Sequence, residues 1–118
     1  MYKALHSDIT IEKSSIHGLG LFAIKAIPKD TVLGISHIKD KDNTGRYDKG
    51  YIRTPLGGFI NHSTQPNCIK VIPRLKLSPR HWPTIKEGEE SSSMAIRTNR
   101  DIKEGEELTV FYTLYKVD

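Results

Sequence analysis

The sequence has very little cysteine and no long apolar segment. Among its 118 residues, Cys68 is the only cysteine. This excludes an intramolecular disulfide, and it excludes a zinc site built from several cysteines of this chain. No uninterrupted apolar run approaches the roughly 18 residues that a membrane-spanning helix needs. We therefore expect an intracellular, reducing location (the cytoplasm or, in a eukaryotic host, the nucleus), with no membrane association and no metal site.

Length and composition fit one globular domain. Hydrophobic residues make up 36% of the chain and charged residues 27%, a balance that argues against a wholly disordered protein. The segment Met1–Thr10 contains Lys3, His6 and Asp8 but not the apolar stretch of a secretory leader. We therefore expect residues 1–118 to form a single domain that is not secreted.

Positive charge exceeds negative charge only modestly. The chain has 18 Lys and Arg against 14 Asp and Glu, a net charge of +4, and its cations are interpreted as scattered among acids. Clustered cations would indicate nucleic-acid binding, whereas scattered charge is typical of an ordinary solvated surface. We therefore expect no direct nucleic-acid binding, although a small basic β-protein acting on nucleic acid stays among the alternatives.

Apolar periodicity predicts strands and no long helix. Short alternating or apolar runs rich in β-branched and aromatic residues are typical of strands, and turn residues separate them here. The expected strands are Ile9–Lys13, Leu19–Lys25, Thr31–Ser36, Ile69–Leu77, Met94–Thr98 and Leu108–Tyr112. The sequence thus predicts a mainly β fold. The polar segment Ser36–Gly50 is expected to cross the surface, and Arg80–Ser93 to form a hairpin loop whose Trp82 folds back onto the body.

Two glycines one residue apart, Gly18 and Gly20, lie between the first two predicted strands. Glycine permits positive φ and the close approach of a ligand to the backbone. The segment is therefore either a tight turn or a ligand-binding loop. A dinucleotide-binding fingerprint is excluded, because no helix follows and the third glycine is absent.

A dense polar cluster follows directly after Phe59 and Ile60, where the sequence reads GGFINHSTQPNC. Buried polar side chains need partners, so Asn61 and His62 either bond to main chain in a buried turn or contact a ligand. A metal site at His62 is not indicated, because no second His or Cys stands at ligand spacing. A lone thiol such as Cys68 is more often a buried side chain than a nucleophile.

The last apolar strand ends in a tyrosine, in the segment GEELTVFY that closes at Tyr112. Its hydroxyl can point into a cavity or into water, since tyrosine carries a polar tip on an apolar body. Alone, this segment does not decide between the two.

In this order, IHGLGLFA, GGFINHSTQPNC and GEELTVFY resemble the motifs of the SET-domain protein lysine methyltransferases. The resemblance runs from about Ile11 to Tyr115, and Asn61–His62–Ser63 followed by Pro66–Asn67 is its most specific part. It implies a β-clip of several small twisted sheets with a C-terminal knot-like crossing near Tyr112. The chain is similar to the minimal stand-alone SET domains of viruses and bacteria.

The resemblance also implies a cofactor, S-adenosyl-L-methionine, and a channel through which the target lysine enters from the opposite face. Tyr112 matches the catalytic tyrosine. The candidate cofactor-binding residues are His17, Gly18, Leu19, Gly20, Asn61, His62 and Tyr115. The candidate substrate-channel residues are Tyr47, Tyr51, Val110 and Phe111.

The chain departs from the family pattern at its C-terminal end. Cysteine-rich zinc segments are absent, Phe111 stands where many members carry an acid, and Val110 stands where an aromatic often limits the number of methyl groups. The sequence predicts a protein-lysine N-methyltransferase that acts on a histone or other basic protein, as a monomer or homodimer. The alternative is a catalytically weak SET scaffold that binds peptide or cofactor.

Overall fold

The computed structural model describes residues 5–39, 51–86 and 91–111. The strands in these residues are β1 (Ile9–Lys13), β2 (Leu19–Ala23), β3 (Val32–Lys39), β4 (Tyr51–Arg53), β5 (Asn61–His62), β6 (Cys68–Val71), β7 (Ser93–Thr98) and β8 (Glu107–Val110). Two short helical segments join them, the α-helix α1 (Pro55–Phe59) and the 3-10 helix η2 (Pro79–His81). Neither of these described helices is long and apolar enough to cross a membrane.

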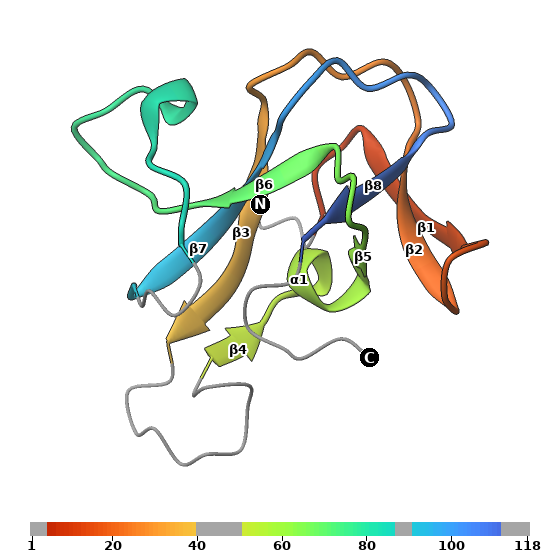
Figure 1. The fold of residues 1–118 in the computed structure, drawn as a ribbon, viewed down its shortest axis with the longest axis horizontal. Coiled ribbons are helices and arrows are strands. Elements are labelled where there is room, and N and C mark those ends of the chain that lie inside the picture. The colour runs from red at the N-terminus through yellow and green to blue at the C-terminus, as the bar shows by residue number, and fades with distance from the viewer. Residues whose placement is uncertain (1–4, 40–50, 87–90, 112–118) are drawn as a thin grey trace.

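The strands form two small sheets, in the orders β1-β2-β8-β5 and β4-β3-β7-β6 (Figure 1). Neighbouring strands are antiparallel except β5 and β8, which run parallel, with Asn61 opposite Thr109 and His62 opposite Val110. The predicted mainly β fold is therefore confirmed. The parallel pair also places the second motif directly beside the third.

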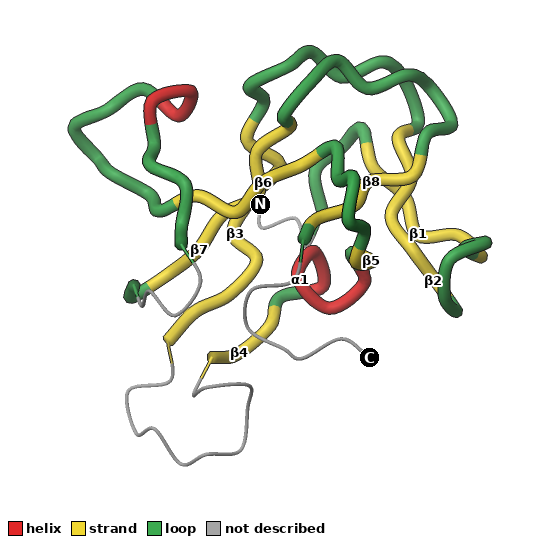
Figure 2. The backbone as a smooth tube through the Cα atoms, in the orientation of Figure 1, coloured by secondary structure: helices red, strands yellow, loops and turns green. Residues whose placement is uncertain are grey.

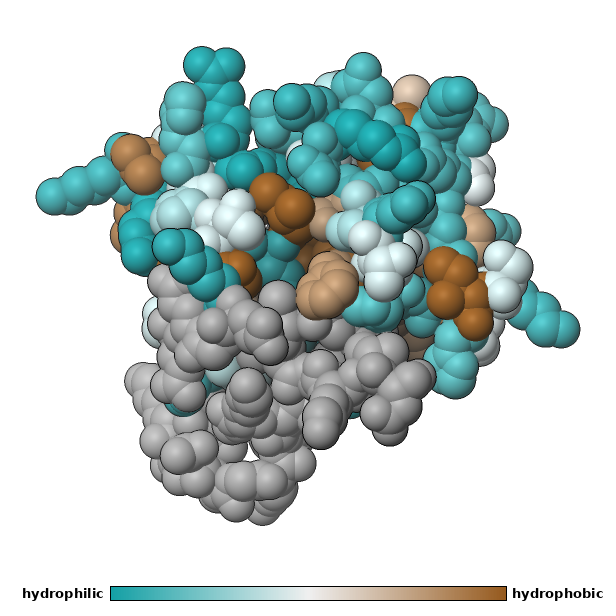
Figure 3. Space-filling model, viewed as in Figure 1, coloured by the Kyte–Doolittle hydropathy of each residue, from teal (hydrophilic) through white to brown (hydrophobic). Residues whose placement is uncertain are grey.

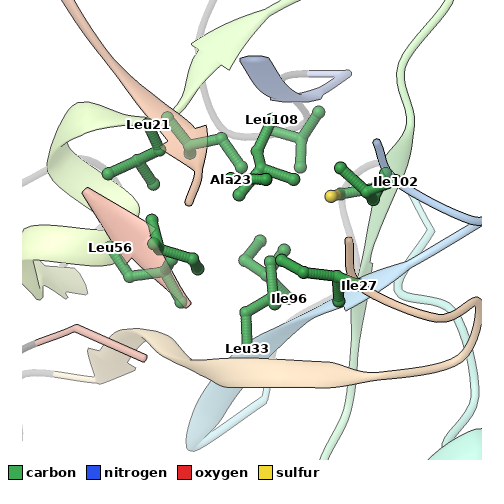
Figure 4. Packing of buried hydrophobic residues seen from close by; sticks show 12 residues of the cluster. Leu21, Ala23, Ile27, Leu33, Leu56, Ile96, Ile102 and Leu108 are labelled. Atoms are coloured by element: carbon green, nitrogen blue, oxygen red, sulfur yellow. The ribbon is translucent and has the colours of Figure 1, made fainter. Parts of the chain in front are cut away.

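The main core lies between the two sheets (Figure 4). Leu21 and Leu108 come from the first sheet, Leu33 and Ile96 from the second, and Leu56 from α1 packs against both sets. Apolar side chains removed from water in this way supply most of the driving force for folding. The coloured part of the face in Figure 3 is largely hydrophilic, with hydrophobic residues in small patches.

The prediction of a strand over Ile69–Leu77 is wrong in its second half. Strand β6 ends at Val71, because Pro73 has no backbone N–H for a sheet and fixes its own φ. Residues 72–85 instead form a loop that projects from the second sheet and contains η2 (Figure 2). The exposed cations of this loop are Arg74, Lys76 and Arg80, and it has no acid, so part of the positive charge is gathered here and is not scattered.

Trp82 holds this 72–85 loop together. Its indole Nε1 donates hydrogen bonds to the carbonyl oxygens of Arg74 and Leu77, at 2.9 and 3.1 Å. The guanidinium Nη1 of Arg97, on β7, donates to the carbonyl oxygens of Pro79 and Trp82, at 2.8 and 3.0 Å. Trp82 thus folds back onto its own loop, and Arg97 fixes that loop to the sheet.

The polar segment after Ser36 differs in part from the prediction. Strand β3 continues to Lys39 and pairs with β4, with His37 opposite Arg53; residues 40–50 lie outside the described part. Strands β4 and β5 and helix α1 were not predicted, because they are too short for a periodic pattern. Helix α1 begins at Pro55, after Thr54, whose Oγ1 accepts a hydrogen bond from the Gly57 backbone N–H.

The predicted strand Ile9–Lys13 is present with the predicted bounds, and the other predicted strands are present with shifted ends. The knot-like crossing near Tyr112 falls outside the described residues and stays a prediction.

Candidate functional site

A cavity of about 440 Å³ lies where the β1–β2 turn meets α1 and β5. Its volume is within the range of roughly 300–1,000 Å³ that small-molecule sites occupy. Its lining residues are His17, Gly18, Leu19, Arg53, Gly58, Phe59 and Asn61. The structure thus brings residues of the first motif and residues of the second motif to the walls of one cavity.

The β1–β2 turn provides one wall of this cavity. Gly18 has a φ of 44°, and the Ser14 backbone N–H donates to the Gly18 carbonyl at 2.8 Å. Ser14 Oγ accepts a hydrogen bond from the Ile16 backbone N–H at 2.9 Å, which closes the turn from within. The segment is therefore a tight turn that also lines a cavity, so the two interpretations of the glycine pair are compatible.

Gly20 is a glycine for a different reason. It is buried in β2, and its φ is outside the left-handed region that Gly18 occupies. A Cβ at this position would lie within 2.3 Å of Glu107 Oε2 and 3.0 Å of Asn61 Nδ2. Gly20 therefore leaves room for a carboxylate of strand β8, which the sequence did not indicate.

Asn61 joins the turn to strand β8. Its Nδ2 lies 3.1 Å from the His17 carbonyl, 3.2 Å from the Leu19 carbonyl, 3.1 Å from Ser14 Oγ and 2.9 Å from Glu107 Oε2. An amide NH₂ group has two hydrogens, so these four acceptors engage all of its donor capacity. The Asn61 side chain is thus held by the protein itself at the edge of the cavity.

Asn67, from the same motif, lies on the other side of β8. Its Nδ2 donates to the Glu107 carbonyl, and its Oδ1 accepts from the Thr109 backbone N–H, each at 2.8 Å. The side chain thus acts like a piece of a neighbouring strand. It is 3% exposed and does not line the cavity.

His62, Phe111, Val110 and Tyr51, also predicted as site residues, are not among the residues that line the cavity. The rings of His62 and Phe111 contact each other, with centroids 4.9 Å apart, and Phe111 is 52% exposed. Val110 is fully buried in the main core. Tyr51 is also fully buried, in a second cluster, and its hydroxyl donates to the Ser91 carbonyl at 2.8 Å. Tyr51 and Val110, predicted as channel walls, are therefore packed in the interior.

Tyr47, Tyr112 and Tyr115 fall outside the described residues. Their roles as channel wall, catalytic tyrosine and cofactor-binding residue stay predictions.

Sequence reasoning did not assign Arg53, Gly58, Phe59 or Glu107 to a site. Gly58 and Phe59 stand inside the second motif and could have been included. Arg53 precedes α1 without any pattern, and only the fold brings it to the cavity. The described lining contains this guanidinium and no carboxylate.

His37 lies opposite Arg53 in the β3–β4 pair. Burial, together with the charges of Lys70 and Arg53, lowers the pKa of His37 to about 3.

The described residues contain no group of three or more His, Cys, Asp and Glu side chains arranged to hold a metal ion.

Comparisons with known proteins agree on one family. The family model of the SET domain matches residues 36–113. A histone-lysine N-methyltransferase specific for H3 lysine 4, from Schizosaccharomyces pombe, is 30% identical over 134 aligned positions, which cover 93% of this chain and 13% of that protein. The chain thus spans about 13% of the length of this relative.

One solved structure supports the fold. A candidate histone methyltransferase of Plasmodium falciparum superposes with a TM-score of 0.59 and 23% sequence identity, covering 89% of this chain and 92% of that one. At this identity the likeness concerns the fold. Because the family model matches well over half of the residues, this chain belongs to the SET domain family.

Proposed function

We propose that this chain is an S-adenosyl-L-methionine-dependent protein-lysine N-methyltransferase. The observation that carries the proposal is the cavity that His17–Leu19 and Asn61 line together in a chain of the SET domain family. The likeness to a yeast enzyme named for histone H3 lysine 4 supports a lysine side chain as the acceptor. A histone or other basic protein is the proposed substrate, which would place the chain in the nucleus or cytoplasm, as a monomer or homodimer.

The cavity residues fit the chemistry of this cofactor. A Cβ built on Gly18 would meet nothing within 4 Å, so the space beside the turn is open to a ligand. Both hydrogens of the Asn61 amide are engaged, so we expect its oxygen to accept from the ligand's ammonium group. The guanidinium of Arg53 can hold a carboxylate by two parallel hydrogen bonds. When bound, the cofactor supplies an electrophilic methyl group on a sulfonium.

The protein's own task is to deliver a neutral amine in the correct direction. A free lysine has a pKa of about 10.4, so its amine must lose a proton before it can attack. A channel that excludes water disfavours the ammonium form and lowers that pKa. Tyr112 is proposed to align the amine, because orientation then controls the rate. Tyr47 and the exposed Phe111 are the proposed aromatic neighbours of the cationic product.

A calorimetric titration tests the binding half of the proposal. Wild-type protein is titrated with S-adenosylhomocysteine and with 5′-methylthioadenosine, which lacks the amino-acid carboxylate. We expect saturable binding of the former, and Arg53→Ala to weaken it about 10-fold, as loss of a charge-assisted contact predicts. The affinity for methylthioadenosine should be the same in the wild type and in Arg53→Ala to within about 2-fold. The matched control is Arg80→Ala in the 72–85 loop, away from the cavity lining.

Transfer of a labelled methyl group to lysine-containing proteins tests the catalytic half. Tyr112→Phe should leave the binding of S-adenosylhomocysteine nearly unchanged. It should reduce turnover about 100-fold, as loss of a positioning group does. Binding without transfer by the wild type would favour the scaffold that only binds cofactor or peptide. No binding of S-adenosylhomocysteine at millimolar concentration would contradict the proposal.

A further inference from the structure

The carboxylate of Glu107 lies at the meeting point of three segments that are distant in the sequence. It accepts hydrogen bonds from Ser14 Oγ, at 2.8 and 2.9 Å to its two oxygens, and from Asn61 Nδ2 at 2.9 Å. Ser14 belongs to the β1–β2 turn, Asn61 to β5, and Glu107 opens β8. One half-buried side chain therefore connects the turn, the second motif and the third motif.

Both partners of Glu107 also hold the turn that lines the cavity. Ser14 Oγ accepts from the Ile16 backbone N–H at 2.9 Å, and Asn61 Nδ2 reaches the His17 and Leu19 carbonyls. A hydroxyl that donates to a carboxylate becomes a better acceptor for its other partners, because hydrogen bonds in a chain polarise one another. The geometry of residues 16–19 therefore depends on a group that does not itself line the cavity.

Gly20 supplies the space for this carboxylate. The buried glycine leaves the region occupied by Glu107 Oε2, because any Cβ there would approach that oxygen to 2.3 Å. Glu107 lies opposite Phe22 in the β2–β8 pair, so Gly20, two residues before Phe22 on the same face of β2, is the diagonal neighbour of Glu107. The glycine and the glutamate thus form one complementary pair across two adjacent strands.

We propose that Glu107 is a positioning residue, which fixes the β1–β2 turn through Ser14 and Asn61 and so sets the shape of the cavity. Gly20 is its steric counterpart. In the sequence, β8 is followed by Phe111 and by Tyr112, the proposed catalytic tyrosine. This inference deepens the proposed function and rests on it where it concerns the cofactor.

A pair of variants and their combination test the proposal. Glu107→Ala and Gly20→Ala should each weaken S-adenosylhomocysteine binding by about 10-fold, the first by removing the carboxylate and the second by displacing it. In the double variant the added methyl group meets no carboxylate, and only the Asn61 amide, 3.0 Å away, has to shift by a few tenths of an ångström. We therefore expect the loss to equal that of Glu107→Ala within about 2-fold, whereas independent effects would multiply to about 100-fold.

Two further variants separate positioning from general destabilisation. Glu107→Gln keeps an oxygen that can accept from Ser14 or Asn61, so it should recover part of the binding that Glu107→Ala loses. Glu104→Ala, at an exposed glutamate of the turn before β8, is the matched control and should bind like the wild type. With a methyl acceptor, Glu107→Ala should raise the KM for the cofactor and leave kcat within about 3-fold.

Amide hydrogen exchange measures the same geometry without any ligand. We expect Glu107→Ala to accelerate exchange across residues 14–19 and to leave the 72–85 loop unchanged. If wild-type protein binds no S-adenosylhomocysteine but this exchange pattern appears, the proposed function fails and the role of Glu107 stands. Losses that multiply in the double variant, or exchange at residues 14–19 that equals that of Glu104→Ala, would overturn the positioning role.

Discussion

Two polar clusters lie on the two sides of strand β8. Both are made from the second and third motifs, GGFINHSTQPNC and GEELTVFY, but they have different roles. On one side, Glu107 and Asn61 hold the β1–β2 turn beside the cavity. On the other side, Asn67 bonds the backbone of β8 at Glu107 and Thr109. The first cluster shapes a surface that a ligand can reach, whereas the second replaces missing strand-to-strand hydrogen bonds. Membership in a motif therefore does not by itself say whether a residue serves binding or folding.

Truncating the two asparagines is the largest test of this comparison. Asn67→Ala leaves the Thr109 N–H and the Glu107 carbonyl without their partner, and each unsatisfied buried group costs about 1–3 kcal/mol. We expect the free energy of unfolding to fall by about 3 kcal/mol, measured by urea denaturation. Asn61→Ala should lower the free energy of unfolding by only about 1 kcal/mol, but it should weaken S-adenosylhomocysteine binding more than Asn67→Ala does.

Asn99→Ala is the control for this pair, because the Asn99 side chain is exposed and its backbone N–H donates to the Asn67 carbonyl at 2.8 Å. Equal losses of stability in Asn61→Ala and Asn67→Ala would remove the distinction between the two sides of the strand.

A smaller effect on the free energy of unfolding is expected from low pH, through Glu106, which contacts Asn67. Glu106 accepts hydrogen bonds from Arg100, from the Lys103 backbone N–H at 3.0 Å and from Asn67 at 3.2 Å. The hydrogen bond from Arg100 is the main reason that the pKa of Glu106 falls to about 2. A carboxyl with a lowered pKa in the folded state stabilises the fold above its unfolded pKa of about 4.5, and this contribution is lost as the pH falls towards 2.

Glu106→Gln should therefore flatten the pH dependence of unfolding between about pH 5 and 2, measured by chemical denaturation at each pH. The exposed Glu104→Gln should follow the wild-type curve. A Glu106→Gln curve parallel to wild type over this range would mean that the Arg100 contact contributes nothing to folding.

A last test, which changes no residue, concerns Cys68, which follows Asn67 and is fully buried. Burial is the main reason that its pKa rises to about 12. The reactive thiolate is then nearly absent at pH 8, so iodoacetamide should label native protein far more slowly than protein unfolded in urea. Rapid labelling of the native form would show that this side of β8 opens readily to solvent.

Local sequence patterns predicted an element correctly where that element interacts mainly with residues close to it in the sequence. The β1–β2 hairpin was predicted from alternation and the turn glycine, because both signals act over a few residues. The strand over Ile69–Leu77 was overextended, because an apolar run resembles a strand whether or not Pro73 ends it. The fold could not be fully anticipated at β4 and α1 either, since elements of three and five residues show no period.

Candidate site residues divide in the same way. Gly18 and Asn61 were indicated by their motifs and line one cavity. Tyr51 was grouped with the channel because it is aromatic, but its ring fills a second core with Met94. Arg53 was overlooked, because its place at the cavity follows from the antiparallel pairing of β4 with β3. Such positions depend on contacts between distant residues, which no local pattern encodes.

By itself the sequence determined the strand-rich character, the turns and the resemblance that indicated the SET family. Only the tertiary structure decided that Glu107 meets Ser14 and Asn61, residues 93 and 46 positions away, and that Gly20 must be small to allow it. The physical reason is that residue identities fix local backbone preferences and hydrogen-bonding capacity. Which donors meet which acceptors is fixed when the parallel pairing of β5 with β8 brings distant segments together.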